Sequence, residues 1–271
     1  MTTSFDAAIV LAAGAGRRMA PAGGTSGTPK PLLAVDAHGT TFLDWHVLAL
    51  GRAGIREIFV VGSEAILGTP LRDVHGVRVT WIDAAAGDRR TGSAFSLHAA
   101  LVSPPGVLDG RSRVLVMDAD LVYDPDLVRE FASAEGAASK TLVCSSHRET
   151  GEEVVVFARA ANGRPCLHGK GLVGSGLTRG LVELGEATGM LAIEPGDHDA
   201  FRAAAEWTLL RSRAGALSEH EDVTQLLLAT GAMDAVVFDD ATRFSECDTP
   251  EDLAHVRNHV APRWRPRLGL V

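Results

Sequence analysis

A glycine-rich segment near the start of the chain combines small residues with arginines, and a lysine follows it. Residues 11–19 read LAAGAGRRM, and Lys30 lies in the segment TPKPLL. Small residues let backbone N–H groups approach a polyphosphate, and arginine adds charge-assisted hydrogen bonds. The glycines alone would also suit an ordinary strand-to-helix turn, because the loop lacks the last glycine of GxGxxG and the GK[ST] of a P-loop. Together with Lys30, the segment predicts a site for a triphosphate.

Two aspartates directly follow an apolar run in the middle of the chain. Residues 113–117 read RVLVM, and Asp118 and Asp120 come next. In an open α/β sheet, ligands bind at the carboxyl ends of the strands. Carboxylates placed there suit Mg²⁺, which takes a few carboxylates together with water and phosphate oxygens. The position therefore predicts an acidic metal site beside the triphosphate.

The spacing of these motifs resembles a known superfamily. LAAGxGxRM, a short gap and PKPLL are similar to the signature of the sugar-nucleotide pyrophosphorylases and cytidylyltransferases. The resemblance implies a Mg²⁺-dependent nucleotidyltransferase in which Lys30 and Arg18 act on the phosphates during catalysis. It also implies a set of residues in contact with the nucleotide, namely Leu11, Ala12, Ala13, Gly14, Ala15, Gly16, Arg17, Gly92, Ser93, Ser96 and Asp118.

The same resemblance implies which acids hold the metal. The residues after Asp120 match the family best when Asp120 is a ligand, with Asp118 as the second choice. Asp248 in the segment ECDTPEDL resembles the family's second metal aspartate. The alternative is that Asp248 only assists a helix cap, because Thr249 suits an N-cap and Pro250 a first helical position.

Ser93 and Ser96 lie where members of this family contact the base. Their hydroxyl groups could bond the edge of a pyrimidine, or they could simply cap and pack a helix. Both interpretations remain open at this stage.

Further segments are similar to the cytidylyltransferases that act on choline phosphate and on 2-aminoethylphosphonate: MDAD at 117–120, HGKG at 168–171 and GEATGM at 185–190. This resemblance implies CTP as donor and a small phosphonate or phosphate ester as acceptor. Lys170 would pair with the phosphonate, and Glu186 or Asp222 would meet an amine or hydroxyl. The alternative for these two acids is solvated surface charge.

Aromatic residues bear on the choice of acceptor. A cage for a quaternary ammonium group needs several Trp or Tyr side chains, and the chain has 1 Tyr and 4 Trp. We therefore expect aminoethyl- or hydroxyethylphosphonate rather than choline phosphate. A myo-inositol 1-phosphate acceptor also stays open, because those cytidylyltransferases have a similar signature.

The elements that must position these residues alternate between strand and helix. Apolar runs predict buried strands at 7–13, 55–61, 77–82 and 113–117, and helical spacing predicts helices at 42–53 and 92–101. Such alternation indicates parallel βαβ units. With the resemblance, it predicts an α/β fold of the Rossmann-like three-layer α/β/α type, with a mostly parallel mixed sheet.

The pattern changes after about residue 140. We expect short strands at 142–145, 154–158 and 235–238, and helices at 200–213 and 223–230. We expect one domain over 1–271, with residues 1–140 binding the nucleotide and residues 141–260 binding the acceptor. The Pro- and Arg-rich stretch 262–267 is expected to fray.

Composition excludes several classes. A net charge of -8 argues against nucleic acid as a partner, and no run of apolar residues is long enough for a membrane span. The 3 cysteines lie far apart, which fits a reducing cytoplasm. A homodimer is left open, since enzymes of this fold are often oligomeric.

Two rival functions remain. One is a related transferase that uses another triphosphate, such as a hexose-1-phosphate or molybdopterin nucleotidyltransferase. The other is a non-catalytic nucleotide sensor or scaffold on the same fold. Loss of Lys30 or of the acids would favour the second rival, but all are present.

Overall fold

The strand β1 (Ala7–Leu11) is buried on both faces and lies inside a mixed sheet. The computed structural model describes residues 5–14, 19, 27–84, 92–103, 106–134, 138–146, 153–211 and 218–270. Within these residues, the strands of the main sheet follow the order β10-β6-β9-β4-β1-β2-β3, and β7 pairs with β8 and β9. Strand β1 pairs in parallel with β2 and β4, and β2 pairs in parallel with β3.

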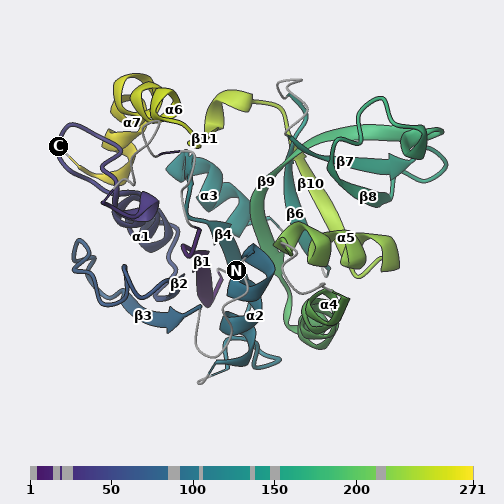
Figure 1. The fold of residues 1–271 in the computed structure, drawn as a ribbon, viewed down its shortest axis with the longest axis horizontal. Coiled ribbons are helices and arrows are strands. Elements are labelled where there is room, and N and C mark those ends of the chain that lie inside the picture. Colours follow the sequence, from purple (N-terminus) through teal and green to yellow (C-terminus); the bar gives the residue numbers. More distant parts are fainter. Residues whose placement is uncertain are drawn as a thin grey trace.

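The strands contributed by the second half of the chain join this parallel part through β9. Strand β9 runs antiparallel to β4, β6 and β7, and β10 runs parallel to β6. The β7–β8 hairpin projects at one end of the molecule in Figure 1. The bounds are β2 (Glu57–Gly62), β3 (Arg78–Asp83), β4 (Val114–Asp118), β6 (Ser139–Cys144), β7 (Val154–Arg159), β8 (Pro165–Lys170), β9 (Leu181–Ile193) and β10 (Met233–Phe238).

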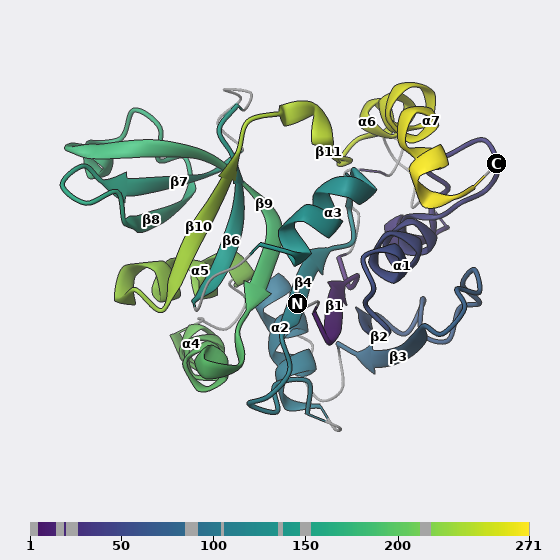
Figure 2. The ribbon, with the colours of Figure 1, turned by 180° about the vertical axis from the view of Figure 1, so that it is seen from behind.

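Helices cover both faces of the sheet. Because successive side chains of a strand point to opposite faces, Ala8 and Val10 of β1 join one buried cluster while Ile9 and Leu11 join another. The first cluster includes residues of α1, α3, α6 and α7, and the second includes residues of α2, α4 and α5 (Figures 1 and 2). The bounds are α1 (Phe42–Arg52), α2 (Ser93–Val102), α3 (Pro125–Ala132), α4 (His198–Arg211), α5 (His220–Thr230), α6 (Pro250–His255) and α7 (Ala261–Trp264). The three-layer α/β/α arrangement with a mixed sheet is therefore confirmed.

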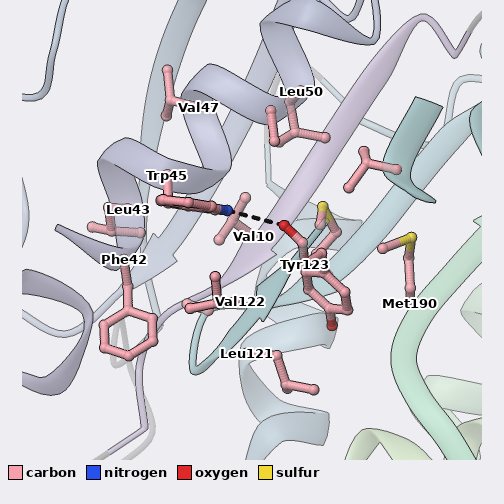
Figure 3. Packing of buried hydrophobic residues seen from close by; sticks show 14 of the residues in the cluster. Val10, Phe42, Leu43, Trp45, Val47, Leu50, Leu121, Val122, Tyr123 and Met190 are labelled. Carbon is pink, nitrogen blue, oxygen red and sulfur yellow. Dashed lines mark hydrogen bonds between the residues drawn. The ribbon is translucent and has the colours of Figure 1, made fainter. Parts of the chain in front are cut away.

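Buried aromatic residues support the short strand β5 (Leu121–Tyr123). This strand follows residues 118–120, which we call the acidic turn, at the end of β4. Trp45 of α1 donates its indole N–H to the carbonyl of Tyr123 at 3.0 Å (Figure 3). The hydroxyl of Tyr123 donates to the carbonyl of Thr188 on β9 at 2.6 Å. Both polar groups are buried, so each needs its partner. These bonds tie the end of the acidic turn to α1 and to β9.

Most of the predicted elements are present, but the sequence did not reveal β9. Its 13 residues are interrupted by Gly185 and Gly189, which both have positive φ. These glycines and the bulges opposite β6 and β7 hide the alternation that would indicate a strand.

The expected fraying of residues 262–267 is wrong. Trp264 is only 2% exposed, and Leu268 is buried in the same cluster as α1. The guanidinium of Arg265 pairs with Asp36, and that of the more exposed Arg267 lies 2.7 Å from the buried carboxylate of Asp124. The arginines that suggested a loose tail therefore attach it to Asp36, in the segment after Lys30, and to Asp124 at the start of α3. Figure 2 shows these last helical turns beside α1.

Candidate active site

Lys30 lies between two aspartates that are far from it in the sequence. Its Nζ atom is 3.1 Å from Oδ2 of Asp120 and 2.8 Å from Oδ1 of Asp248. Lys30 begins a 3-10 helix (Lys30–Leu32), Asp120 follows β4, and Asp248 precedes α6. The structure thus brings together the lysine and both acids that the resemblance implied as metal ligands.

A small second sheet explains how the two aspartates meet. Strand β11 (Phe244–Glu246) pairs antiparallel with β5, and Glu246 lies opposite Leu121. The backbone N–H of Cys247 then donates to the carbonyl of Asp120 at 3.2 Å. This pairing places the residue after Cys247 beside the acidic turn.

Asp248 is not needed for the helix cap. Thr249 is the N-cap of α6 and forms a capping box with Asp252. The Asp248 carboxylate instead accepts a hydrogen bond from Lys30. The helix cap thus fixes the backbone at Asp248, while its side chain serves the site.

The two neighbouring carboxylates keep the buried Lys30 side chain protonated. Its side chain is 6% exposed, whereas those of Asp120 and Asp248 are 41% and 19% exposed. Burial alone would lower the pKa of Lys30, but Asp120 and Asp248 outweigh it and the pKa is raised. Lys30 is therefore an ammonium ion that contacts Asp120 and Asp248. We call these three residues the open pair, because the carboxylate of Asp120 is partly exposed.

The donor set fits a hard divalent cation such as Mg²⁺. Oδ2 of Asp120 and Oδ1 of Asp248 both point toward the Nζ atom of Lys30. Among the described residues, no group of three or more His, Cys, Asp or Glu side chains has the arrangement of a metal site. Asp120 and Asp248 would thus supply two ligands and leave the rest to phosphate oxygens and water, which is the coordination that Mg²⁺ accepts.

Asp118 serves a different part of the site than Asp120. Its Oδ2 atom is 3.4 Å from Nε2 of His220. It also packs against Gly189, where a Cβ atom would lie 2.2 Å from the carboxylate. Burial raises the pKa of Asp118. The side chain thus contacts residues of the second half of the chain.

The predicted nucleotide residues lie along one edge of the sheet as far as the structure describes them. Leu11 ends β1, Ala12 donates its N–H to the carbonyl of Val61 at 2.8 Å, and Ala13 and Gly14 continue toward the surface. Ala15, Gly16, Arg17 and Arg18 lie outside the described residues. Their roles remain predictions.

Gly92, Ser93 and Ser96 lie at the start of α2, and the two serines differ in what surrounds them. The Ser93 hydroxyl donates to Oε2 of Glu219 at 2.7 Å. It also lies 3.0 Å from Nδ1 of His220, while Ser96 is buried one turn further on. Ser93 is thus engaged by α5, which favours the capping and packing alternative for this residue.

Lys170 and Glu186 line a cavity between β8, β9 and α5 that also reaches Asp118. Its wall is rich in ionisable side chains, which among the described residues are Asp118, Glu153, His168, Lys170, Glu186, His220, Glu221 and Glu246. Asp222 is not part of this wall. It is the N3 residue of the α5 capping box, where its carboxylate accepts from the backbone of Glu219.

Several residues of this cavity went unrecognised in the sequence. Glu221 and His220 belong to a segment that reads EHED, and only Asp222 was chosen from it. A helix start that carries four ionisable residues is a usable signal. Which of them face the cavity depends on their positions around the helix axis, and these are known only once the helix is packed in the fold.

Comparison with known proteins adds to this geometry. Residues 8–192 match the family described as the MobA-like NTP transferase domain. The chain belongs to this family. The match includes most of β1, Lys30, Asp120 and most of β9, but it ends before Asp248.

One curated relative is N-acetylmuramate alpha-1-phosphate uridylyltransferase of Neisseria meningitidis serogroup B (strain ATCC BAA-335 / MC58). It is 32% identical over 133 residues, which are 47% of this chain and 52% of the relative. The match thus spans about half the length of that protein.

Solved structures of nucleotidyltransferases share the fold. An inositol-1-phosphate CTP transferase from T. maritima aligns with a TM-score of 0.67 at 18% identity, over 96% of this chain and 100% of that one. A putative glucose-1-phosphate thymidylyltransferase from Bacillus anthracis aligns with a TM-score of 0.66 at 18% identity, over 93% and 94%. The predicted nucleotidyltransferase fold is therefore confirmed. No helix among the described residues is both long and apolar enough to cross a bilayer.

Proposed function

We propose that this protein is a Mg²⁺-dependent cytidylyltransferase that transfers CMP from CTP to a small aminoalkylphosphonate and releases pyrophosphate. The observation that carries the proposal is the position of Lys30, which lies within 3.1 Å of both Asp120 and Asp248. The residues before Asp120 lie beside the end of β1, because the N–H of Ala119 donates to the carbonyl of Leu11 at 3.0 Å.

The reaction needs no nucleophile from the protein. A phosphonate oxygen of the acceptor forms a bond to the α-phosphorus of CTP, the bond from that phosphorus to the oxygen that bridges to the β-phosphorus breaks, and pyrophosphate leaves. Both reactants are anions, so the protein must bring them together and stabilise the developing charge. Lys30 is suited to this because its side chain is buried, charged and fixed in place by Asp120 and Asp248.

Asp120 and Asp248 would hold the metal ion. When bound, Mg²⁺ supplies positive charge to the phosphate oxygens and to the leaving pyrophosphate. The two carboxylates belong to different segments, so the β5–β11 pairing that joins these segments becomes part of the binding site.

The cavity next to Asp118 would receive the acceptor. Its carboxylates outnumber its one lysine, and no Phe, Tyr or Trp lines it among the described residues. Coulomb attraction in such a cavity favours an acceptor that carries an ammonium group. The lack of an aromatic wall argues against a quaternary ammonium, so a primary amine is the better match. Lys170 would meet the phosphonate and Glu186 the amine.

A second acceptor class has its own support. Carboxylates also bond hydroxyl groups, and the relatives named above act, by their names, on sugar or inositol phosphates. A sugar 1-phosphate or inositol phosphate is therefore the second candidate, with UTP or another triphosphate as donor. We place either reaction in the cytoplasm, as the free state of Cys144, Cys166 and Cys247 fits a reducing compartment.

Pyrophosphate release tests the proposal. The purified protein is incubated with Mg²⁺, each of CTP, UTP, ATP and GTP, and a panel of acceptors: 2-aminoethylphosphonate, 2-hydroxyethylphosphonate, choline phosphate, myo-inositol 1-phosphate and hexose 1-phosphates. We expect release with CTP and 2-aminoethylphosphonate above all other pairs. Release with a sugar phosphate instead would replace the acceptor, and silence across the panel would contradict transferase activity.

A further inference from the structure

His220, the first residue of α5, is buried between carboxylates from two parts of the fold. Its Nε2 atom is 3.4 Å from Oδ2 of Asp118 at the end of β4, and its Nδ1 atom is 3.1 Å from Oε2 of Glu221. The side chain itself is 4% exposed. The imidazole therefore joins the acidic turn of the first half of the chain to a helix of the second half.

A second contact fixes the backbone at this point. The N–H of His220 donates to the hydroxyl oxygen of Ser93 at 2.7 Å, and the Ser93 hydroxyl donates to Glu219 at 2.7 Å. The start of α2 thus lies against the start of α5. The approach is so close that a Cβ on Gly92 would lie 2.2 Å from the carbonyl oxygen of Ser218. His220 cannot move without disturbing both helix starts.

Asp118 and Glu221, the two partners of the imidazole, both line the acceptor cavity. The imidazole lies between these two side chains, so its position fixes how far apart they stand in the wall. The other carboxylates of the wall are Glu153, Glu186 and Glu246.

We propose that His220 is a positioning residue, which holds Asp118 and Glu221 in the wall of the cavity and thereby sets the affinity for the acceptor. Its contacts named above, with Asp118, Glu221 and Ser93, do not include Lys30 or the metal pair Asp120 and Asp248. Without the imidazole, the two carboxylates lose their shared partner and rearrange, and the cavity loses its shape on the side of α5. This inference rests on the proposed function, because it concerns the same acceptor.

The substitution His220→Gln tests the inference through the separate Michaelis constants. We expect the KM for 2-aminoethylphosphonate to rise about tenfold or more, as for loss of a hydrogen bond to a charged group. The KM for CTP should change by less than about threefold, because uniform loss of acceptor binding leaves the other substrate untouched. His259→Gln is the matched control, since His259 is exposed, follows α6 and does not line the cavity.

A double-mutant cycle tells positioning from general destabilisation. The variants are His220→Gln, Glu221→Gln and the double variant, each compared by acceptor KM and by thermal unfolding. If His220 acts through Glu221, the double variant should lose little more affinity than His220→Gln alone. Additive losses would overturn the inference, as would a lower unfolding temperature with an unchanged acceptor KM, or an equal rise in both KM values.

Ser93→Ala provides a milder variant should His220→Gln fail to fold. It removes the hydroxyl that binds the backbone of His220 but leaves the imidazole in place. A rise in acceptor KM that exceeds any rise in CTP KM supports the inference, and no rise in acceptor KM contradicts it. The wild type separates the two proposals: without pyrophosphate release the proposed function fails, whereas an active wild type with unaffected variants fails only the inference.

Discussion

Two buried cations lie on opposite sides of the acidic turn after β4, and each is flanked by two carboxylates. Lys30 lies between Asp120 and Asp248, and His220 lies between Asp118 and Glu221. The difference lies in what surrounds them. Asp120 is 41% exposed, whereas Asp248, Asp118 and Glu221 are 19%, 18% and 27% exposed. The backbone of His220 is also bound by Ser93.

This comparison teaches that alternate aspartates of one short motif can have separate duties. An open ion pair can exchange its partners for a metal ion or for phosphates, because little desolvation stands in the way. A closed pair keeps its geometry and shapes the cavity next to it. We therefore interpret Asp120 as a ligand of the reacting groups and Asp118 as part of the acceptor wall.

The largest effect is expected from removing the cation of the open pair. Lys30→Ala should lower kcat by about 100-fold to 1,000-fold, the range seen when one preorganised electrostatic contact to a transition state is lost. Lys140→Met is a matched control, because Lys140 is also buried but lies on β6 outside this site. Steady-state kinetics with CTP in excess measures both. A Lys30→Ala rate near that of the wild type would remove the open pair from the mechanism.

A buried neutral histidine accompanies each pair, and both should make stability depend on pH. Burial lowers the pKa of His46, which lies beside Tyr123, and that of His168, which lies beside Glu221, to about 4 in each case. Since the unfolded chain takes up these protons near pH 6.5, the free energy of unfolding should fall as the pH drops from about 6.5 to about 4. Each histidine contributes up to about 3 kcal/mol over this window.

Urea denaturation at several pH values between 7 and 4 measures this dependence. The substitution His168→Gln should flatten the curve, because the variant has one fewer group that the unfolded chain protonates first. His255→Gln is the control, as His255 is exposed on α6. An unchanged slope in His168→Gln would show that this histidine is not buried in its neutral form.

Replacing the acids of the open pair should act on the metal requirement. Asp120→Asn and Asp248→Asn should each raise the Mg²⁺ concentration for half-maximal rate about tenfold or more. Asp118→Asn should leave that concentration nearly unchanged and raise the acceptor KM instead. Titration of the initial rate with MgCl₂ distinguishes the three. The same shift in the Mg²⁺ concentration in all three variants would show that Asp118 does not differ in role from Asp120 and Asp248.

The smallest effect is expected at Glu186 on the rim of the acceptor cavity. Glu186→Gln should raise the KM for 2-aminoethylphosphonate a few-fold, as for a partly screened ion pair. The KM for 2-hydroxyethylphosphonate should stay almost the same, because that acceptor has no positive charge. Parallel kinetics with both acceptors makes the comparison. Equal changes for the two would argue that Glu186 does not meet an ammonium group.

Much of the fold could be predicted from periodicity. The parallel strands around β1 are apolar on both faces, and α1 shows helical spacing with a Thr41 and Asp44 capping box, so local patterns were sufficient there. Strand β9 could not be predicted, because its glycines interrupt the alternation and its partners come from distant segments. The tail was predicted to fray since nothing local shows that Arg265 has a buried partner in Asp36.

The sequence by itself determined the chemistry that is available. A glycine loop after a buried strand, one lysine downstream and aspartates after a central strand predict a phosphate-binding edge, because these signals are local in the chain. Only the tertiary structure decided which side chains each acid contacts. The pairing of β11 with β5 carries Asp248 to Lys30, and the contact between α2 and α5 encloses His220 with Asp118. Both depend on contacts across more than one hundred residues, which spacing along the chain does not encode.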